Sequence, residues 1–255
     1  MNINEIRAME KLSANGWVAL EKEVYDGCEL RFSQGYTGRA NSVSIYEEPK
    51  SEISQLVEYC EKKYEEKGLP CNFKLTDADK ELTNYLTNRG YKVVTPTDVM
   101  ILNLNDDEFV KYLAPIQKIM EGVKFSEDYK DWIETYFELE GFTDEVKKDV
   151  YRKINANTKA KQVYVTVYFE GKQIAVASAV IEDGYSLLHN VIVDSKYRGL
   201  GLGKKLCLAT LAKAKEMGAK YSYLQVIQEN AVAVNLYKKL GYKKEYAYCY
   251  MKQNK

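Results

Sequence analysis

The 255-residue chain lacks the features on which several classes of protein depend. Its five cysteines are odd in number, scattered and never arranged as C-x-x-C, which argues against a disulfide framework and a zinc site. Lys plus Arg and Asp plus Glu both number 37, so no overall field favours nucleic acid or an anionic membrane. No apolar run approaches the roughly 18 residues of a membrane span, and the amino terminus does not resemble a signal peptide. We therefore expect a cytoplasmic protein with reduced thiols, no metal, and neither nucleic acid nor membrane as partner.

Length and composition predict a globular protein of two domains. The chain is 45% hydrophobic and 29% charged, and it exceeds the roughly 100–200 residues of a single domain. The segments "LTNYLTNRGYKVV" (82–94) and "AVNLYKKLGYKKE" (233–245) have the same form at an offset of 242 − 91 = 151 residues. This match indicates a duplication, although coincidence explains so short a match equally well. We place the boundary near residue 106, which gives domains of 1–106 and 107–255.

The second domain has the pattern of a mixed α/β sheet. Residues 160–193 alternate and are rich in Val, Ile and Tyr, and Glu170-Gly171 and Asp183-Gly184 predict hairpin turns between three antiparallel strands. A helix follows, then the buried strand "YSYLQVI", a helix capped by Asn230, and a last strand "KKEYAYCYM". Two amphipathic helices precede these elements. The first of them is acidic, which would suit a cationic amine, although a solvated helix face explains the charges better.

The stretch "RGLGLGKK" (198–205) is the strongest local signal. A P-loop needs a glycine five residues before Gly203 and a Ser or Thr after the lysine, but Arg198 and Lys205 stand there. A dinucleotide-binding loop needs G-x-G-x-x-G after a βαβ pattern, but the spacing here is G-x-G-x-G and hairpins precede it. The remaining interpretation is R-x-x-G-x-G, made by Arg198, Gly201 and Gly203, between a strand and a helix.

This motif, together with a second one, resembles the GNAT superfamily of acyl-CoA-dependent N-acyltransferases. The family's pattern N-x-x-A-x-x-L-Y-x-x-x-G-F corresponds here to Asn230, Ala233, Leu236, Tyr237, Gly241 and Tyr242, the last a change from Phe. The resemblance covers about residues 110–252. It implies the GNAT fold, with acetyl-CoA as cosubstrate and its pyrophosphate held by the glycine loop. The physics agrees, because glycines let successive backbone amides point at one anion at the start of a helix.

The resemblance also implies roles for individual residues. Tyr237 is expected to be the general acid, and Ile192 and Val193 to supply an amide for the thioester carbonyl beside a strand bulge. His189, the only histidine, could accept the amine's proton, but a hydrogen-bonded histidine within a sheet is an equally open interpretation. The expected cofactor-binding residues are Val191, Ile192, Val193, Arg198, Gly199, Leu200, Gly201, Leu202, Gly203, Lys204, Asn230, Ala233 and Tyr237.

The first hundred residues resemble the amino-terminal part of bacterial GNAT proteins with two tandem domains. At the 151-residue offset, Tyr237 corresponds to Leu86 and Asn230 to Asp79, and no R-x-x-G-x-G loop occurs before residue 106. We therefore expect a degenerate first domain that transfers no acyl group. It would instead shape the acceptor cleft or support the catalytic domain.

The expected function is transfer of an acetyl or other short acyl group from acyl-CoA to a primary amine, by direct transfer in a ternary complex. Two alternatives stay open: a non-catalytic acyl-CoA sensor or scaffold, and a transferase acting on a protein lysine or amino terminus. The acceptor is thus a small-molecule amine or a peptide amine. The aromatic last strand could also pair across a homodimer.

Overall fold

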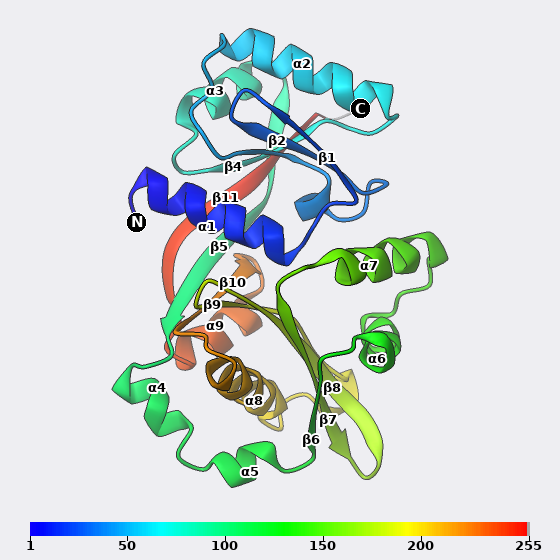
Figure 1. Cartoon of the computed structure of the whole chain (residues 1–255), viewed down its shortest axis with the longest axis vertical. Coiled ribbons are helices and arrows are strands. Elements are labelled where there is room, and N and C mark those ends of the chain that lie inside the picture. The colour runs from blue at the N-terminus through cyan, green and yellow to red at the C-terminus, as the bar shows by residue number, and fades with distance from the viewer. Residues whose placement is uncertain (254–255) are drawn as a thin grey trace.

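Over residues 1–253, which the computed structural model describes, eleven strands form one mixed sheet in the order β1-β2-β3-β4-β11-β5-β10-β9-β8-β7-β6 (Figure 1). The strands are β1 (Glu21–Tyr25), β2 (Cys28–Phe32), β3 (Val43–Ile45), β4 (Asn72–Thr76), β5 (Tyr91–Asn103), β6 (Val123–Ser126), β7 (Lys161–Phe169), β8 (Lys172–Glu182), β9 (Tyr185–Val193), β10 (Tyr221–Ile227) and β11 (Lys243–Gln253). The predicted mixed α/β fold is therefore confirmed.

Nine α-helices accompany this sheet within the described residues. They are α1 (Ile3–Gly16), α2 (Ile53–Glu66), α3 (Lys80–Asn88), α4 (Asp107–Tyr112), α5 (Ile116–Met120), α6 (Lys130–Glu140), α7 (Glu145–Asn157), α8 (Leu202–Glu216) and α9 (Ala231–Lys239). Successive side chains of β7 and β8 point to opposite faces of the sheet, and different helices cover the two faces. Val163, Val165 and Ala177 pack with α8, whereas Tyr164 and Val176 point the other way and pack with α6 and α7.

The predicted hairpins form where the sequence places them. Strands β7, β8 and β9 are antiparallel neighbours. Their turns, Glu170-Gly171 and Asp183-Gly184, have positive φ at both residues, as two-residue turns matching the strand twist require. The structure adds strand β6, which pairs with β7 at the edge of the sheet. Sequence reasoning missed β6 because a four-residue strand exposed on most of its length carries no clear alternation.

The last strands of the two sequence repeats have exchanged places. Strand β11 lies between β4 and β5, and β5 in turn lies between β11 and β10. In Figure 1 the two strands run side by side through the middle of the molecule, joining the elements above to those below. The repeat units α3–β5 and α9–β11 are the two segments that match at the 151-residue offset. The expected last strand therefore exists, but its neighbours belong to the first hundred residues, and the boundary near residue 106 stays a prediction.

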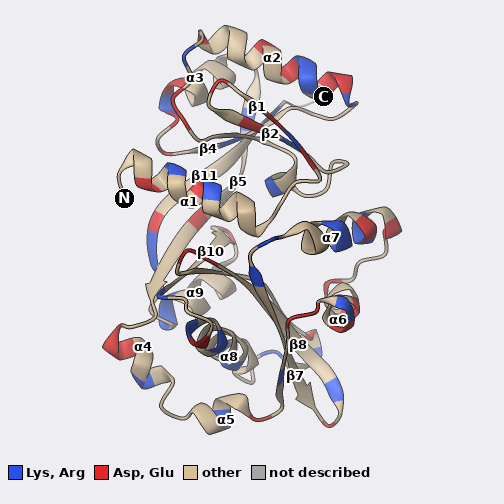
Figure 2. Ribbon diagram, viewed as in Figure 1, with Lys and Arg blue, Asp and Glu red and all other residues tan. Residues whose placement is uncertain are grey.

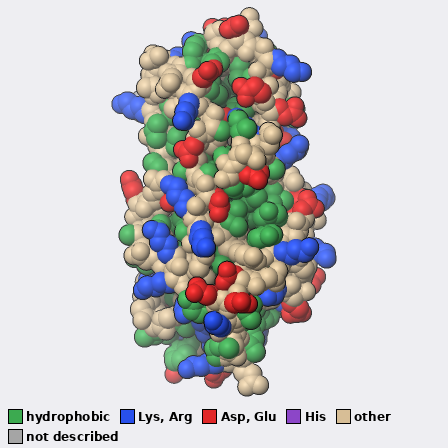
Figure 3. Space-filling model, turned by 90° about the vertical axis from the view of Figure 1, so that its left-hand side faces the viewer, with side chains coloured by type: hydrophobic (Ala, Val, Ile, Leu, Met, Phe, Trp, Pro, Cys, Tyr) green, Lys and Arg blue, Asp and Glu red, His purple; other side chains and the backbone are tan. Residues whose placement is uncertain are grey.

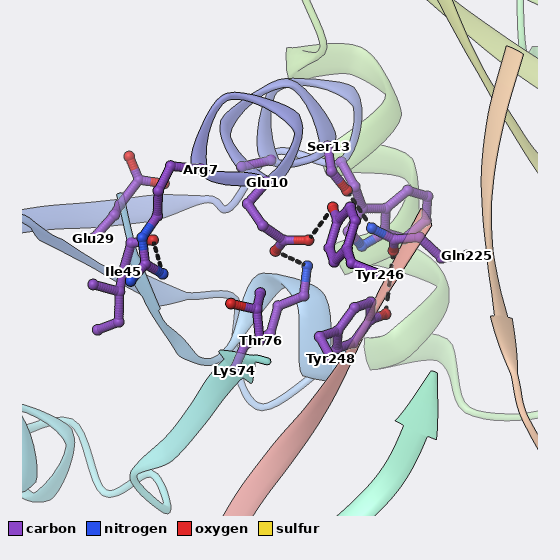
Figure 4. A network of polar contacts seen from close by, with 12 residues as sticks. Arg7, Glu10, Ser13, Glu29, Ile45, Lys74, Thr76, Gln225, Tyr246 and Tyr248 are labelled. Atoms are coloured by element: carbon purple, nitrogen blue, oxygen red, sulfur yellow. Dashed lines mark hydrogen bonds and ion pairs between the residues drawn. The ribbon is translucent and has the colours of Figure 1, made fainter. Parts of the chain in front are cut away.

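Helix α1 ties together strands from both repeats (Figure 4). Its first turn is closed by a capping box between Asn2 and Glu5. One turn further along its buried side, Glu10 forms a buried ion pair with Lys74 of β4 at 2.5 Å and accepts a hydrogen bond from the Tyr246 hydroxyl of β11 at 2.7 Å. Removing one partner of the buried Glu10–Lys74 pair would leave a charge without compensation. The pair therefore holds α1 against the strands at the place where the two repeats meet.

Charges of both signs are interspersed along the elements (Figure 2) and over the face shown in Figure 3. This distribution agrees with the equal numbers of acidic and basic residues in the sequence. Among the described helices, none combines the length and the apolar character that crossing a membrane requires.

Candidate active site

Strand β9 bulges and separates from its parallel neighbour β10. Pairing between the two strands extends only from Tyr185 opposite Tyr221 to Leu187 opposite Tyr223. On its other edge, β9 pairs His189 with Ser178 and Ile192 with Val176, so the two residues 190 and 191 face one residue of β8. Asn190, in this bulge, has φ 56°. The bulge and the separation together open a gap beside the second half of β9.

The glycine loop follows this strand and leaves several backbone amides without a partner. Gly199 and Gly201 have φ values of 81° and 78°, which side chains with a Cβ rarely adopt. Helix α8 begins immediately afterwards, and its first internal hydrogen bond runs from the Lys205 amide to the Gly201 carbonyl at 3.1 Å. Within the described residues, no amide from 199 to 204 donates a hydrogen bond. The helix dipole adds positive potential at this end, so the loop suits an anion such as a phosphate.

A cavity of about 700 Å³ lies along the end of β9, the glycine loop and the start of α9. We call it the cofactor cavity. All the residues expected to bind the cofactor line it except Leu200. The Leu200 side chain is 71% exposed and lies on the outside of the loop. Asn230 also has a structural role: its side chain accepts a hydrogen bond from the Ala233 amide at 3.1 Å and caps the amino terminus of α9.

Sequence reasoning missed four residues of the cofactor cavity: Glu140, Tyr197, Val232 and Leu236. Val232 and Leu236 could have been found, because Leu236 belongs to the motif on α9 and Val232 lies beside it with its side chain 84% exposed. Glu140 could not, because it ends α6, some fifty residues earlier in the chain. Burial raises the pKa of Glu140, and the charge of Arg198 opposes this shift.

A second cavity of about 360 Å³ adjoins the first residues of the β9 bulge. We call it the acceptor cavity. Tyr237 lines both cavities, and His189 and Asn190 line this one. Burial raises the pKa of Tyr237 above its ordinary value near 10, so its phenol stays protonated at neutral pH. Within the described residues its hydroxyl forms no hydrogen bond, which leaves the proton available to a bound molecule.

His189 is half-buried and neutral. Burial, and secondly the charge of Arg39, lower its pKa to about 3. The Asn190 side-chain amide lies 3.3 Å from Nδ1 and donates to it, which leaves the proton of the neutral ring on Nε2. In this state His189 donates from Nε2 and is a weak base. The ring also packs edge-on against Trp17, with the ring centroids 5.7 Å apart.

This environment predicts how acid affects stability. Because the pKa of His189 lies below that of an unfolded histidine, the unfolded chain binds the extra proton between about pH 6.5 and pH 3. The free energy of unfolding should therefore fall on acidification through that window, by up to about 1.4 kcal/mol per pH unit. His189→Gln should remove this part of the slope in urea unfolding measured from pH 7 to pH 4. An unchanged slope would contradict the prediction.

The first repeat has a cavity at the position that corresponds to the cofactor cavity, but the charges that line it are different. Strands β3 and β4 are parallel and joined through α2, as β9 and β10 are joined through α8. A cavity of about 510 Å³ lies there, lined by the carboxylates of Glu48, Glu52, Asp79 and Glu81. Asp79, which corresponds to Asn230, forms a buried ion pair with Arg7 of α1. No glycine lies between β3 and α2, so this place lacks the loop that suits a phosphate.

Comparison with known proteins places this arrangement in a family. Residues 126–242 match the Acetyltransferase (GNAT) family. The carboxyl-terminal part of the chain is a GNAT acetyltransferase domain. Over 251 residues the chain is also 29% identical to the "Uncharacterized N-acetyltransferase YobR" of Bacillus subtilis (strain 168), covering 94% of this chain and 95% of that protein. These matches support an acyltransferase whose residues 126–242 belong to the GNAT family.

Solved structures show the same fold over both repeats. A GCN5-related N-acetyltransferase from Kribbella flavida superposes with a TM-score of 0.69 at 16% identity, covering 100% of this chain and 97% of that one. A tandem GNAT protein from the clavulanic acid biosynthesis pathway superposes with a TM-score of 0.63 at 12% identity, covering 82% of this chain and 74% of that one. The resemblance to the GNAT superfamily, including its tandem members, is thus confirmed at the level of the fold.

Proposed function

We propose that this GNAT protein transfers an acetyl group from acetyl-CoA to a primary amine within a ternary complex. The observation that carries the proposal is that Tyr237 forms part of the wall of two cavities. One of them has the anion-binding glycine loop, and the other is open beside the same strand bulge. A thioester in the first and an amine in the second would meet at Tyr237, and such positioning is a large part of catalysis of a two-substrate reaction.

The cofactor cavity would hold the two ends of acetyl-CoA differently. The free amides at the start of α8 and the positive charges of Arg198 and Lys204 suit the pyrophosphate. Arg198 also donates from Nε to the Val193 carbonyl at 3.2 Å, which joins the loop to the strand. The splayed part of β9 suits the pantetheine arm, since its unpaired edge offers backbone groups.

Strand geometry favours one of the two amides expected to polarise the thioester carbonyl. The Asp194 amide donates to the Ile174 carbonyl of β8 at 2.8 Å. Because successive amides of a strand point to opposite edges, the Val193 amide points toward the gap and the Ile192 amide points toward β8. We propose Val193 for this role, with Ile192 contributing its side chain to the cavity wall.

In the proposed mechanism the neutral amine attacks the carbonyl carbon, the carbon–sulfur bond breaks, and Tyr237 protonates the departing thiolate. The ammonium proton leaves to His189 or to water. Its lowered pKa and its Nε2 proton make His189 the weaker of these two candidates. Water in the acceptor cavity is therefore our preferred route for the proton.

We further propose that residues 1–106 form a degenerate GNAT-like domain whose role is to complete the acceptor cavity. Thr37, Gly38 and Arg39 of its loop line that cavity, together with Thr95 and Thr97 of β5. The corresponding cavity of the first repeat is lined by carboxylates, and the charge of Arg7 in it is already paired with Asp79. This cavity would therefore repel a pyrophosphate. One acetyl-CoA per chain should therefore bind.

Calorimetric titration with acetyl-CoA, beside an assay of thiol release over a panel of amines, tests the proposal. We expect a stoichiometry of one and amine-dependent release of CoA. Gly201→Glu should abolish binding, because it places a negative charge where the phosphates would lie. Gly201→Asn is the matched control: asparagine tolerates the left-handed backbone, and a Cβ meets no atom within 4 Å there.

The outcomes separate the alternatives. Binding without turnover of any small amine would favour the acyl-CoA sensor or a protein acceptor. No binding would mean that the glycine loop holds another anion, and the proposal would fail. Two acetyl-CoA molecules per chain would contradict the degeneracy of the first domain.

A further inference from the structure

The acceptor cavity is positively charged. Arg39 and Lys252 line it, from the loop after β2 and from β11, and no Asp or Glu is among its lining residues in the described chain. Neither cation forms an ion pair or a side-chain hydrogen bond within residues 1–253. The six acidic residues between 127 and 140 do not reach this cavity: Glu140 lines the cofactor cavity, and Glu127 lines a separate one.

Arg39 is held in place by its surroundings. Its guanidinium carbon lies 4.6 Å from the centroid of the Trp17 ring, a cation–π contact. The Trp17 indole donates to the Thr37 hydroxyl at 3.0 Å, which fixes the ring against the same loop. The loop itself is tied by buried Asn41, whose side chain donates to the Thr37 carbonyl at 2.9 Å. The guanidinium is therefore oriented without using any carboxylate of the protein.

The charge of Arg39 also acts on the groups around it. It is the second cause, after burial, of the lowered pKa of His189, which lines the same cavity. None of the lining residues of the acceptor cavity in the described chain carries a carboxylate, so nothing among them neutralises this charge. Holding the uncompensated charge of the half-buried Arg39 side chain beside this cavity costs free energy unless a bound anion completes the site.

From this geometry, and on the basis of the proposed function, we propose that the acceptor carries an anionic group, a carboxylate or a phosphate, in addition to its amine. The guanidinium fork of Arg39 would bind the anion through two parallel hydrogen bonds, and Lys252 would add a second charge. The amine would then be placed toward Tyr237, on the wall shared with the cofactor cavity. Polyamines and other acceptors with only positive charges would be repelled.

Matched pairs of acceptors test this inference through kcat/KM measured by thiol release. Each pair differs only in the anion: lysine against cadaverine, glutamate against its diamide, and glucosamine 6-phosphate against glucosamine. We expect at least a tenfold preference for the anionic member of a pair. Amino acids and amino phosphates are separate arms, so the result also tells which anion the site takes.

Substitution of Arg39 tests whether the preference for anionic acceptors depends on this residue. Arg39→Gln should reduce the preference to within about threefold, chiefly through KM, while the dissociation constant for acetyl-CoA stays unchanged. Arg89→Gln is the matched control, because its guanidinium pairs with Glu61 outside the cavity, and it should keep the wild-type preference.

Two results would overturn the inference while leaving the proposed function intact. One is equal or better turnover of the members without an anion, and the other is a preference that survives in Arg39→Gln. Turnover of none of these amines, although acetyl-CoA binds, would overturn it as well. Failure to bind acetyl-CoA is a different result, seen in the titration alone, and it would remove the proposed function first.

Discussion

Residues 107–255 produced without the first 106 residues should not fold into a stable, active protein. Strand β11 would lose both of its neighbours, β4 and β5, and β10 would lose β5. The side chains left without cover are large: Tyr246, Tyr248, Tyr250 and Met251 are each at most 6% exposed in the whole chain. Burying such a side chain contributes about 1.5–3 kcal/mol, so losing this cover is comparable to the whole stability of a domain, about 5–15 kcal/mol.

Circular dichroism and thermal unfolding of the purified fragment measure this directly. We expect little cooperative unfolding and extensive aggregation, because unpaired strand edges promote it. Co-expression of residues 1–106 with 107–255 is the control, and it should restore a folded, acetyl-CoA-binding complex. A fragment that is monomeric, unfolds cooperatively and keeps full activity would contradict both this prediction and the proposed role of the first domain.

The exchange of strands also explains which parts of the fold could be predicted from sequence. Hairpins and caps are local, so Asp183-Gly184 and Asn230 predict their turn and their helix start correctly. Both segments of the weak repeat form a helix followed by a strand, α3–β5 and α9–β11, but the order of strands in a sheet depends on contacts between residues far apart. "EYAYCYM" alternates in the same way whether its neighbours belong to its own repeat or to the other one. No local pattern could therefore place β11 next to β4.

The candidate site also has one part that could be predicted from sequence and one part that could not. The residues around Gly201 could be named because a phosphate site needs glycines and a helix start close together in sequence, and Tyr237 could be named because it belongs to the second GNAT motif. Arg39 could not, because it lies 198 − 39 = 159 residues before Arg198, in a segment that carries no recognised motif. Its importance depends on the loop reaching across to the other repeat, which only the folded chain shows. The proposed cofactor site is thus largely local in the sequence, whereas the proposed acceptor site depends on the tertiary structure.

Tyr237→Phe should lower kcat by about 10²–10⁴ while leaving the dissociation constant of acetyl-CoA nearly unchanged. The phenyl ring would still line both cavities and pack edge-on against Tyr242, with the ring centroids 5.9 Å apart, so the walls would keep their shape. The lost hydroxyl forms no hydrogen bond in the described chain, so the thermal midpoint should hardly move. What disappears is the proton for the departing thiolate.

The raised pKa of Tyr237 gives the same experiment a second readout. In the wild-type enzyme, kcat should not fall through loss of the phenol proton until well above pH 10, because burial disfavours the phenolate. Tyr221→Phe is the matched control: that ring is 38% exposed and stacks on Tyr185 at the far end of β10, so kcat should stay within a factor of two. If Tyr237→Phe behaved like this control, the thiolate would leave without protonation by this residue, and Tyr237 would be a wall of the two cavities rather than their acid.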